Sequence, residues 1–153
     1  MRIRADEHVS REIVRIICEL PLSHDFELSS IFDVGHGGSP DEYWATEFAK
    51  EGGNAILTAD TDFFRKPNQI VAIDQTGLKV IHLPSRWANA QAHLQAAHIL
   101  MWWSRIEAKL HKANPREVWM VPWNINEAGE LKRKKVDYGA AHKKFKKAKR
   151  HSG

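Results

Sequence analysis

Short apolar runs recur along the first 85 residues of the chain, and amphipathic stretches separate most of them. Each run is bounded by glycine, proline or polar residues, which is typical of buried strands. The predicted strands of this part are residues 1–5, 26–34, 55–57, 71–73 and 80–83. Strands that alternate with helices favour right-handed crossovers and a largely parallel sheet.

Two helices are predicted within the same part of the chain. In residues 9–20 apolar side chains recur at helical spacing, and Pro21 ends this helix. In residues 39–50 the start is marked by Ser39, which can cap a helix, and by Glu42, which completes a capping box. A glycine pair, Gly52 and Gly53, then stops the second helix.

A long helix, roughly residues 88–112, opens the second part of the chain. Its wide apolar face contains Trp102 and Trp103, which at helical spacing are expected in the core or a dimer interface, with base stacking as the alternative. After it we predict a strand at 117–121, a turn at 126–129 and a returning strand at 132–136. Residues 140–150 predict a basic helix or a disordered tail.

The composition is that of a globular protein of about one domain. No apolar run approaches the roughly 20 residues of a membrane span, and the charged N-terminus is unlike a signal peptide. The single cysteine, Cys18, permits no internal disulfide and is expected to be a buried thiol. These features predict a cytoplasmic protein, organised as a domain at 1–130 and a basic extension at 131–153.

The net charge of +4 is distributed unevenly along the chain. Residues 131–153 carry ten lysines and arginines against one acid, Asp137, for a net +9, so the remaining chain carries −5. An acidic body with a basic tail suggests a polyanionic partner. A disordered, solubilising tail is the alternative.

Thr58, Asp60 and Asp62 directly follow the predicted strand at 55–57. Ligands of open α/β sheets bind outside the carboxyl ends of the strands. Two carboxylates placed there repel each other, which raises one pKa unless a cation lies between them. A hard divalent ion such as Mg²⁺ or Mn²⁺ prefers these oxygen ligands. The alternative is that both aspartates are turn and N-cap residues.

Other acids also lie at the ends of predicted elements. Asp6 follows the first strand, and Asp41 and Glu42 begin the second helix. If the first and third strands are neighbours, these groups converge with Asp60 and Asp62 on one rim of the sheet. Taken singly, Asp6 could cap a helix, and Asp41 or Glu42 could complement a helix dipole. Together they predict one or two hard metal ions, which can activate water for phosphoryl displacement.

Three segments, in this order, resemble the PIN-like nucleases, and most closely their toxin-like branch, the VapC-type toxins. They are Arg4-Ala-Asp-Glu-His8, Ser39-Pro-Asp-Glu42 and Leu57-Thr-Ala-Asp-Thr-Asp-Phe63. The resemblance covers about residues 1–85. The chain departs from the family pattern in its charged first strand and in everything from residue 87 onward.

The resemblance implies a PIN-like α/β fold with a central, mostly parallel sheet of about four or five strands flanked by helices. It also implies a Mg²⁺- or Mn²⁺-dependent endoribonuclease, the toxin of a toxin–antitoxin pair, with RNA and an antitoxin protein as partners. A homodimer is a further option. The implied catalytic acids are Asp6, Asp41, Glu42, Asp60 and Asp62, and the implied metal ligands are Asp6, Asp41, Asp60 and Asp62. Asp41 is favoured over Glu42 as the second carboxylate, and Thr58 is the implied supporting hydroxyl.

Several side chains near the predicted rim have two interpretations. His8 and His36 could relay a proton or could be loop and capping residues. Arg65 and Lys66 could hold a phosphate or be ordinary solvated charge. For the whole chain, the alternatives are a non-catalytic PIN-like module that binds RNA or protein, and an unrelated α/β domain with a structural Asp-x-Asp turn.

Overall fold

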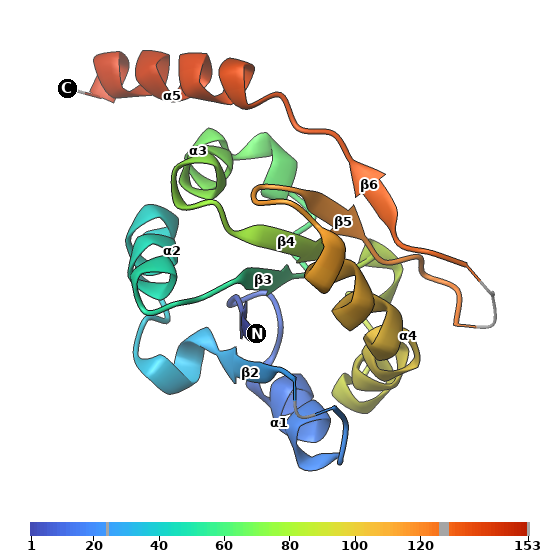
Figure 1. Ribbon diagram of the computed structural model, residues 1–153. Coiled ribbons are helices and arrows are strands. Elements are labelled where there is room, and N and C mark those ends of the chain that lie inside the picture. Colours follow the sequence, from blue (N-terminus) through green and yellow to red (C-terminus); the bar gives the residue numbers. More distant parts are fainter. Residues whose placement is uncertain (24, 126–128, 153) are drawn as a thin grey trace.

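The computed structural model of the chain describes residues 1–23, 25–125 and 129–152. Within them six strands form one sheet in the order β2-β1-β3-β4-β5-β6 (Figure 1). The first five strands of that order run parallel, and β6 runs antiparallel to β5. The strands are β1 (Arg2–Ala5), β2 (Glu27–Ser30), β3 (Ala55–Thr58), β4 (Lys79–His82), β5 (Val118–Met120) and β6 (Lys132–Lys134).

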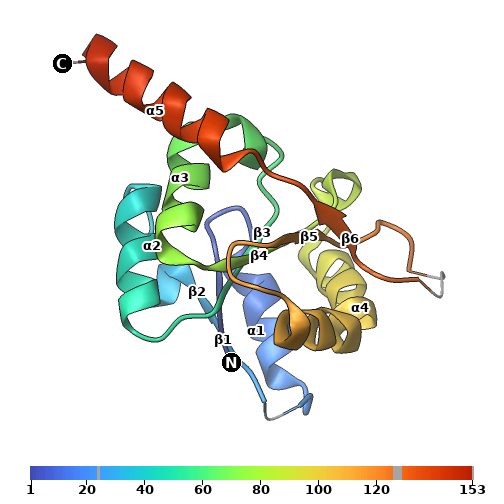
Figure 2. The same ribbon diagram turned by 45° about the horizontal axis from the view of Figure 1, so that its top comes forward.

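Helices cover both faces of this sheet (Figure 2). One face packs against α1 (Arg11–Glu19) and α4 (Ala92–Lys112), and its core includes the buried Trp102 and Trp103. The other face packs against α2 (Asp41–Lys50) and α3 (Pro67–Thr76), with α5 (Tyr138–Ser152) outside α3. Short 3₁₀ helices are η1 (Ile31–Val34), η2 (Phe63–Arg65) and η3 (Ser85–Trp87). None of the helices described is long and apolar enough to cross a membrane.

The mixed α/β fold with a mostly parallel, helix-flanked sheet confirms the predicted fold class. The sheet has six strands, more than the four or five that the resemblance implies, because the strands predicted at 117–121 and 132–136 join it as β5 and β6 beyond β4. Leu131 is buried in the core next to β6, and α5 packs on α3. The basic C-terminal residues therefore include an edge strand and a docked helix.

Two predicted strands differ from the structure. Residues 71–73 lie inside α3, because a short apolar run does not distinguish a strand from a buried helical turn. Pro67 opens this helix, and Gly77 closes it in the left-handed conformation with φ 76°. Of residues 26–34, only Glu27–Ser30 is a strand, and η1 follows it. The turn predicted at 126–129 lies mostly outside the described residues.

Two local predictions are also wrong. Pro40 rather than Ser39 is the N-cap of α2, and no side chain of the described residues caps that helix. Ser39 lies in a turn, where its backbone N–H donates to the His36 carbonyl. Glu42 therefore completes no capping box. Cys18 is exposed rather than buried. The buried face of α1 includes Ile17, and the next residue, Cys18, points away from that face.

The chain switches direction within the sheet between β1 and β3. From β1 it crosses to β2 on one side, and it then returns past β1 to β3 on the other side. Such a switch point leaves a crevice outside the carboxyl ends of the two neighbouring strands. Asp6 follows β1 and Asp60 follows β3, so the topology brings both residues to this crevice.

Candidate active site

Asp6 lies at the end of β1 and is almost completely buried, with 5% of its surface exposed. Its own backbone N–H donates to the Leu57 carbonyl at 3.0 Å, which continues the pairing with β3. Its carboxylate accepts hydrogen bonds from the Thr58 hydroxyl and from the His8 backbone N–H. The sheet and its neighbours therefore fix the position of this carboxylate.

Asp60 is the centre of the cluster, and only 3% of its surface is exposed. Its backbone N–H donates to Thr58 Oγ1 at 3.1 Å, so one hydroxyl links it to Asp6. Its Oδ2 accepts a hydrogen bond from Lys66 Nζ at 2.9 Å and lies 3.4 Å from His8 Nε2. Its Oδ1 accepts from the Asp62 backbone N–H at 2.9 Å, which tightens the turn into η2.

Asp41, the first residue of α2, joins the same cluster through Gln69. Its Oδ1 accepts from the Trp44 indole N–H at 3.1 Å, and its Oδ2 accepts from Gln69 Nε2 at 2.8 Å. The same Gln69 nitrogen lies 3.4 Å from Asp60 Oδ2. One point, now filled by an amide nitrogen, thus lies within 3.4 Å of carboxylate oxygens from both Asp41 and Asp60.

The other two predicted acids are placed differently. Asp62 is the residue before η2, and its side chain is 57% exposed and pairs with Arg65 at 3.7 Å. Glu42 is partly buried in the first turn of α2, where its backbone carbonyl accepts from the Thr46 hydroxyl. The hydrogen-bonded cluster of the structure therefore joins Asp6, Asp41 and Asp60, with Asp62 at its exposed edge.

The electrostatic environment separates the two buried aspartates. Burial raises the pKa of Asp6 to about 6, although hydrogen bonds from Thr58 and the His8 backbone act against it. Burial also acts to raise the pKa of Asp60, but the hydrogen bonds from Lys66 and the Asp62 backbone outweigh it, and the net pKa lies below the ordinary value. The pKa of Lys66 is raised by the same contact. Asp60 is therefore the firmly ionised carboxylate of the cluster.

The donor set fits a hard divalent cation. A small cavity of about 20 Å³, room for one water or ion, is lined by Asp6, Asp41 and Gln69 together with apolar side chains. Gln69 Oε1 is buried and receives no hydrogen bond from the described residues, so turning the amide would offer an oxygen to a cation. Carboxylate and amide oxygens are the ligands that Mg²⁺ and Mn²⁺ prefer.

A second set of ligand atoms lies elsewhere in the described chain. Asp25, Glu107 and His111 each offer one ligand atom, and the three atoms lie within 4.8 Å of one another. Asp25 precedes β2, and its carbonyl accepts a hydrogen bond from the Met1 amino group, so this group lies at the amino ends of the strands. Asp6, Asp41 and Asp60 are not packed as tightly, because the amide of Gln69 lies between the last two.

The sequence did not indicate Gln69 as a member of the cluster, and it indicated a different role for Lys66. Gln69 carries no charge and lies within a helix that was predicted in part as a strand, so nothing in the pattern marked it. Lys66 was a candidate for holding phosphate, but its ammonium pairs with Asp60. His8 lies beside Asp60, whereas His36 forms an edge contact with the ring of Tyr43.

A comparison with protein families matches residues 1–85 to the PIN-like domain. No curated protein and no solved structure matches the chain. The matched residues contain β1 through β4 and the whole cluster of Asp6, Asp41, Asp60 and Gln69.

Proposed function

Because the chain belongs to the PIN-like domain family, we propose that it is a metal-dependent endoribonuclease. PIN-like domains are generally nucleases, and the family match spans more than half of this chain. The observation that carries the proposal is the convergence of Asp6, Asp41 and Asp60 at the switch point between β1 and β3. Buried carboxylates gathered at the ligand-binding edge of a sheet are costly unless they serve a cation.

In this proposal Asp6, Asp41 and Asp60 hold Mg²⁺ or Mn²⁺, and Asp62 and Glu42 contribute from the outer edge. A bound ion of this kind supplies an activated water and stabilises the charge that develops on a phosphate during in-line displacement. Thr58 keeps the Asp6 carboxylate oriented through its hydroxyl. Lys66, whose side chain is 40% exposed, is placed to attract the phosphate to the same rim.

We further propose that the enzyme is the toxin of a toxin–antitoxin pair. The order and spacing of the three motifs at residues 4–8, 39–42 and 57–63 support this, because they resemble the toxin-like branch of the family. RNA is then the substrate, and a cognate antitoxin protein is the partner that restrains the activity.

The test is cleavage of RNA by the purified protein with Mn²⁺, comparing wild type with Asp60→Asn. The substitution removes one charge and keeps the size, so the fold should survive while cleavage falls at least 100-fold, about 2.7 kcal/mol of barrier. Asp33→Asn is the matched control, since Asp33 is exposed, pairs with Arg11 and makes none of the hydrogen bonds described for the cluster. Equal cleavage by wild type and Asp60→Asn would remove the active-site assignment.

One observation favours a second candidate function, a non-catalytic PIN-like module that binds RNA or protein. The ammonium of Lys66 contacts Asp60 directly, which neutralises the carboxylate that a metal ion would need. The same assay separates the two functions. An enzyme cleaves RNA only when a divalent ion is added, whereas a binding module retains RNA uncut with and without the ion.

A further inference from the structure

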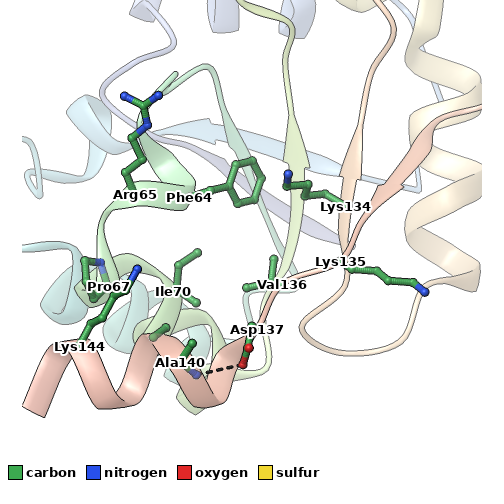
Figure 3. A pocket seen from close by; sticks show the side chains of 11 residues that line it. Phe64, Arg65, Pro67, Ile70, Lys134, Lys135, Val136, Asp137, Ala140 and Lys144 are labelled. Atoms are coloured by element: carbon green, nitrogen blue, oxygen red, sulfur yellow. Dashed lines mark hydrogen bonds between the residues drawn. The ribbon is translucent and has the colours of Figure 1, made fainter.

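A groove of about 260 Å³ lies between the η2–α3 segment and the β6–α5 segment (Figure 3). We call it the basic groove. Side chains from both segments line it. The η2–α3 wall contributes Phe64, Arg65 and Ile70, and the β6–α5 wall contributes Lys134, Lys135 and Lys144. It is distinct from the acidic cluster, because none of the three clustered aspartates lines it.

The lining of the basic groove is strongly cationic. Among the described residues that line it, four side chains are basic and one, that of Asp137, is a carboxylate. Asp137 Oδ1 accepts the backbone N–H of Ala140 at 2.9 Å, so this carboxylate serves to begin α5. Lys134 and Lys144 are exposed, and the described structure gives neither of them an anionic partner. A polyanion is the ligand that such a surface attracts.

An aromatic ring also lines the basic groove. The ring of Phe64 lies beneath the ammonium of Lys134, with 5.3 Å from Nζ to the ring centroid. Stacking on an aromatic ring combined with phosphate contacts from lysines is how proteins hold unpaired nucleotides. A duplex offers no free base face for this ring, so the combination favours a single strand.

The basic groove adjoins the acidic cluster through η2. The Phe64 ring lies 5.2 Å from the ring of His82, and His82 Nε2 lies 2.8 Å from the backbone oxygen of Asp60. Along the chain, Arg65 of the groove is followed at once by Lys66, which contacts Asp60. The basic groove and the acidic cluster therefore border the same segment of the chain, η2.

One wall of the basic groove comes from outside the family match at residues 1–85. That wall is fixed to the body of the protein, since His142 of α5 lies 2.7 Å from Asp74 of α3, and the Tyr138 hydroxyl donates to the Arg116 carbonyl. Ala141 is buried against α3. The extension beyond the family match thus forms half of a preformed groove.

We propose that the basic groove holds a single strand of the nucleic-acid substrate beside the acidic cluster, with a base on Phe64 and phosphates along Lys134 and Lys144. This inference rests on the proposed nuclease function for its substrate. It differs from that function in assigning the phosphate contacts of the substrate to Lys134 and Lys144, which lie outside the family match.

The test measures binding without cleavage. A fluorescent oligouridylate of about 12 nucleotides, within the site size of single-strand binders, is titrated in EDTA at several salt concentrations. For wild type the logarithm of affinity falls with the logarithm of salt, and Lys134→Gln/Lys144→Gln should make that slope shallower by about 1.4, or 0.7 per lost phosphate contact. Phe64→Leu should weaken binding about tenfold and leave the salt slope unchanged, because the ring carries no charge.

The matched control is Arg15→Gln/Lys112→Gln, which also removes two positive charges, but from α1 and α4 on the other face of the sheet. It should keep the wild-type slope. Melting curves establish that each variant is folded. The inference is overturned if the groove variant and the control have equal slopes, if a duplex RNA binds as well as the single strand, or if only an acidic peptide binds.

The outcomes also separate the two proposals. If no metal supports cleavage but the groove variant has the shallower salt slope, the groove inference stands and the nuclease proposal fails. If metal-dependent cleavage is found and the groove variant binds like wild type, the nuclease proposal stands and the groove inference fails.

Discussion

At the scale of single residues, the amide of Gln69 lies between the carboxylates of Asp41 and Asp60 and reduces their repulsion when no cation is bound. Its amide nitrogen donates to Asp41 and lies 3.4 Å from Asp60, and its oxygen is buried without a donor among the described residues. One neutral side chain therefore separates two negative charges. The same side chain can present either its nitrogen to the acids or its oxygen to an ion.

This role predicts the effect of Gln69→Glu. A fourth carboxylate in the cluster should lower the free energy of unfolding by about 2–4 kcal/mol in EDTA, because a buried like charge is left unpaired. Mn²⁺ should recover most of that loss, since the ion compensates the added charge. Urea unfolding with and without Mn²⁺ measures both effects.

Gln75→Glu provides the control, because Gln75 is exposed on the same helix. It should change the stability by less than about 0.5 kcal/mol under either condition. If Gln69→Glu is no less stable than Gln75→Glu in EDTA, Gln69 does not separate buried charges.

The clustered aspartates and the amide differ in how far the sequence alone could locate them. Asp6 and Asp60 were found because strand ends are recognisable from short apolar runs, and parallel strands bring their carboxyl ends together. Asp41 was preferred to Glu42 because Glu42 was expected to complete a capping box, and that capping box is absent. Gln69 was missed because its role depends on two aspartates that lie 28 and 9 residues away in the chain.

At the scale of elements, Asp74 joins three parts of the fold. On α3 it accepts a hydrogen bond from Arg116, which precedes β5, and it lies 2.7 Å from His142 of α5. The Arg116 hydrogen bond is the largest influence that holds the pKa of Asp74 below its ordinary value. The contact anchors the helix that forms one wall of the basic groove.

We therefore expect Asp74→Asn to destabilise the protein in a pH-dependent way. A carboxylate with a lowered pKa stabilises the fold above the ordinary value of about 4, and this contribution is lost as pH falls through the lowered pKa. Near pH 7 the variant should melt about 2–4 °C below wild type, a size typical of a partly exposed ion pair.

Thermal melting from pH 7 down to about pH 2 provides the measurement, and the two melting temperatures should converge at the acidic end. A difference that stays constant over this range would mean that Asp74 acts by shape rather than by charge.

The elements themselves were predicted unevenly from the sequence. The long helix α4 was recognised almost to the residue at its end, because its apolar positions recur over 21 residues. The helix α3 was mistaken in part for a strand, since it is only ten residues long and its run at residues 71–73 is buried on all sides. Burial from every direction removes the periodicity that distinguishes the two structures.

At the scale of the whole molecule, the mostly parallel sheet flanked by helices could be predicted from the sequence, and the docking of α5 outside α3 could not. Alternating strands and helices define a parallel sheet with its ligand crevice at the carboxyl ends. The docking of α5 depends on contacts such as Asp74 with His142, across 68 residues of chain. Composition alone allowed either a basic helix or a disordered tail for the same residues.

The acidic cluster should couple metal binding to the stability of the whole fold. An ion that binds only the native protein stabilises it by about 2.7 kcal/mol at 100 times its dissociation constant. For a domain of this size Mn²⁺ should then raise the melting temperature by about 5–10 °C. Asp60→Asn should lose most of that shift, and an equal shift in both proteins would place the binding elsewhere.

The most direct test of the central claim is the position of Mn²⁺ in crystals soaked with the ion, read from its anomalous scattering. We expect a peak in contact with carboxylate oxygens of Asp6, Asp41 and Asp60, with Lys66 displaced from Asp60. A peak at Asp25, Glu107 and His111 with none at the acidic cluster, or no peak at either group, would contradict the proposal that this cluster is a metal-dependent nuclease site.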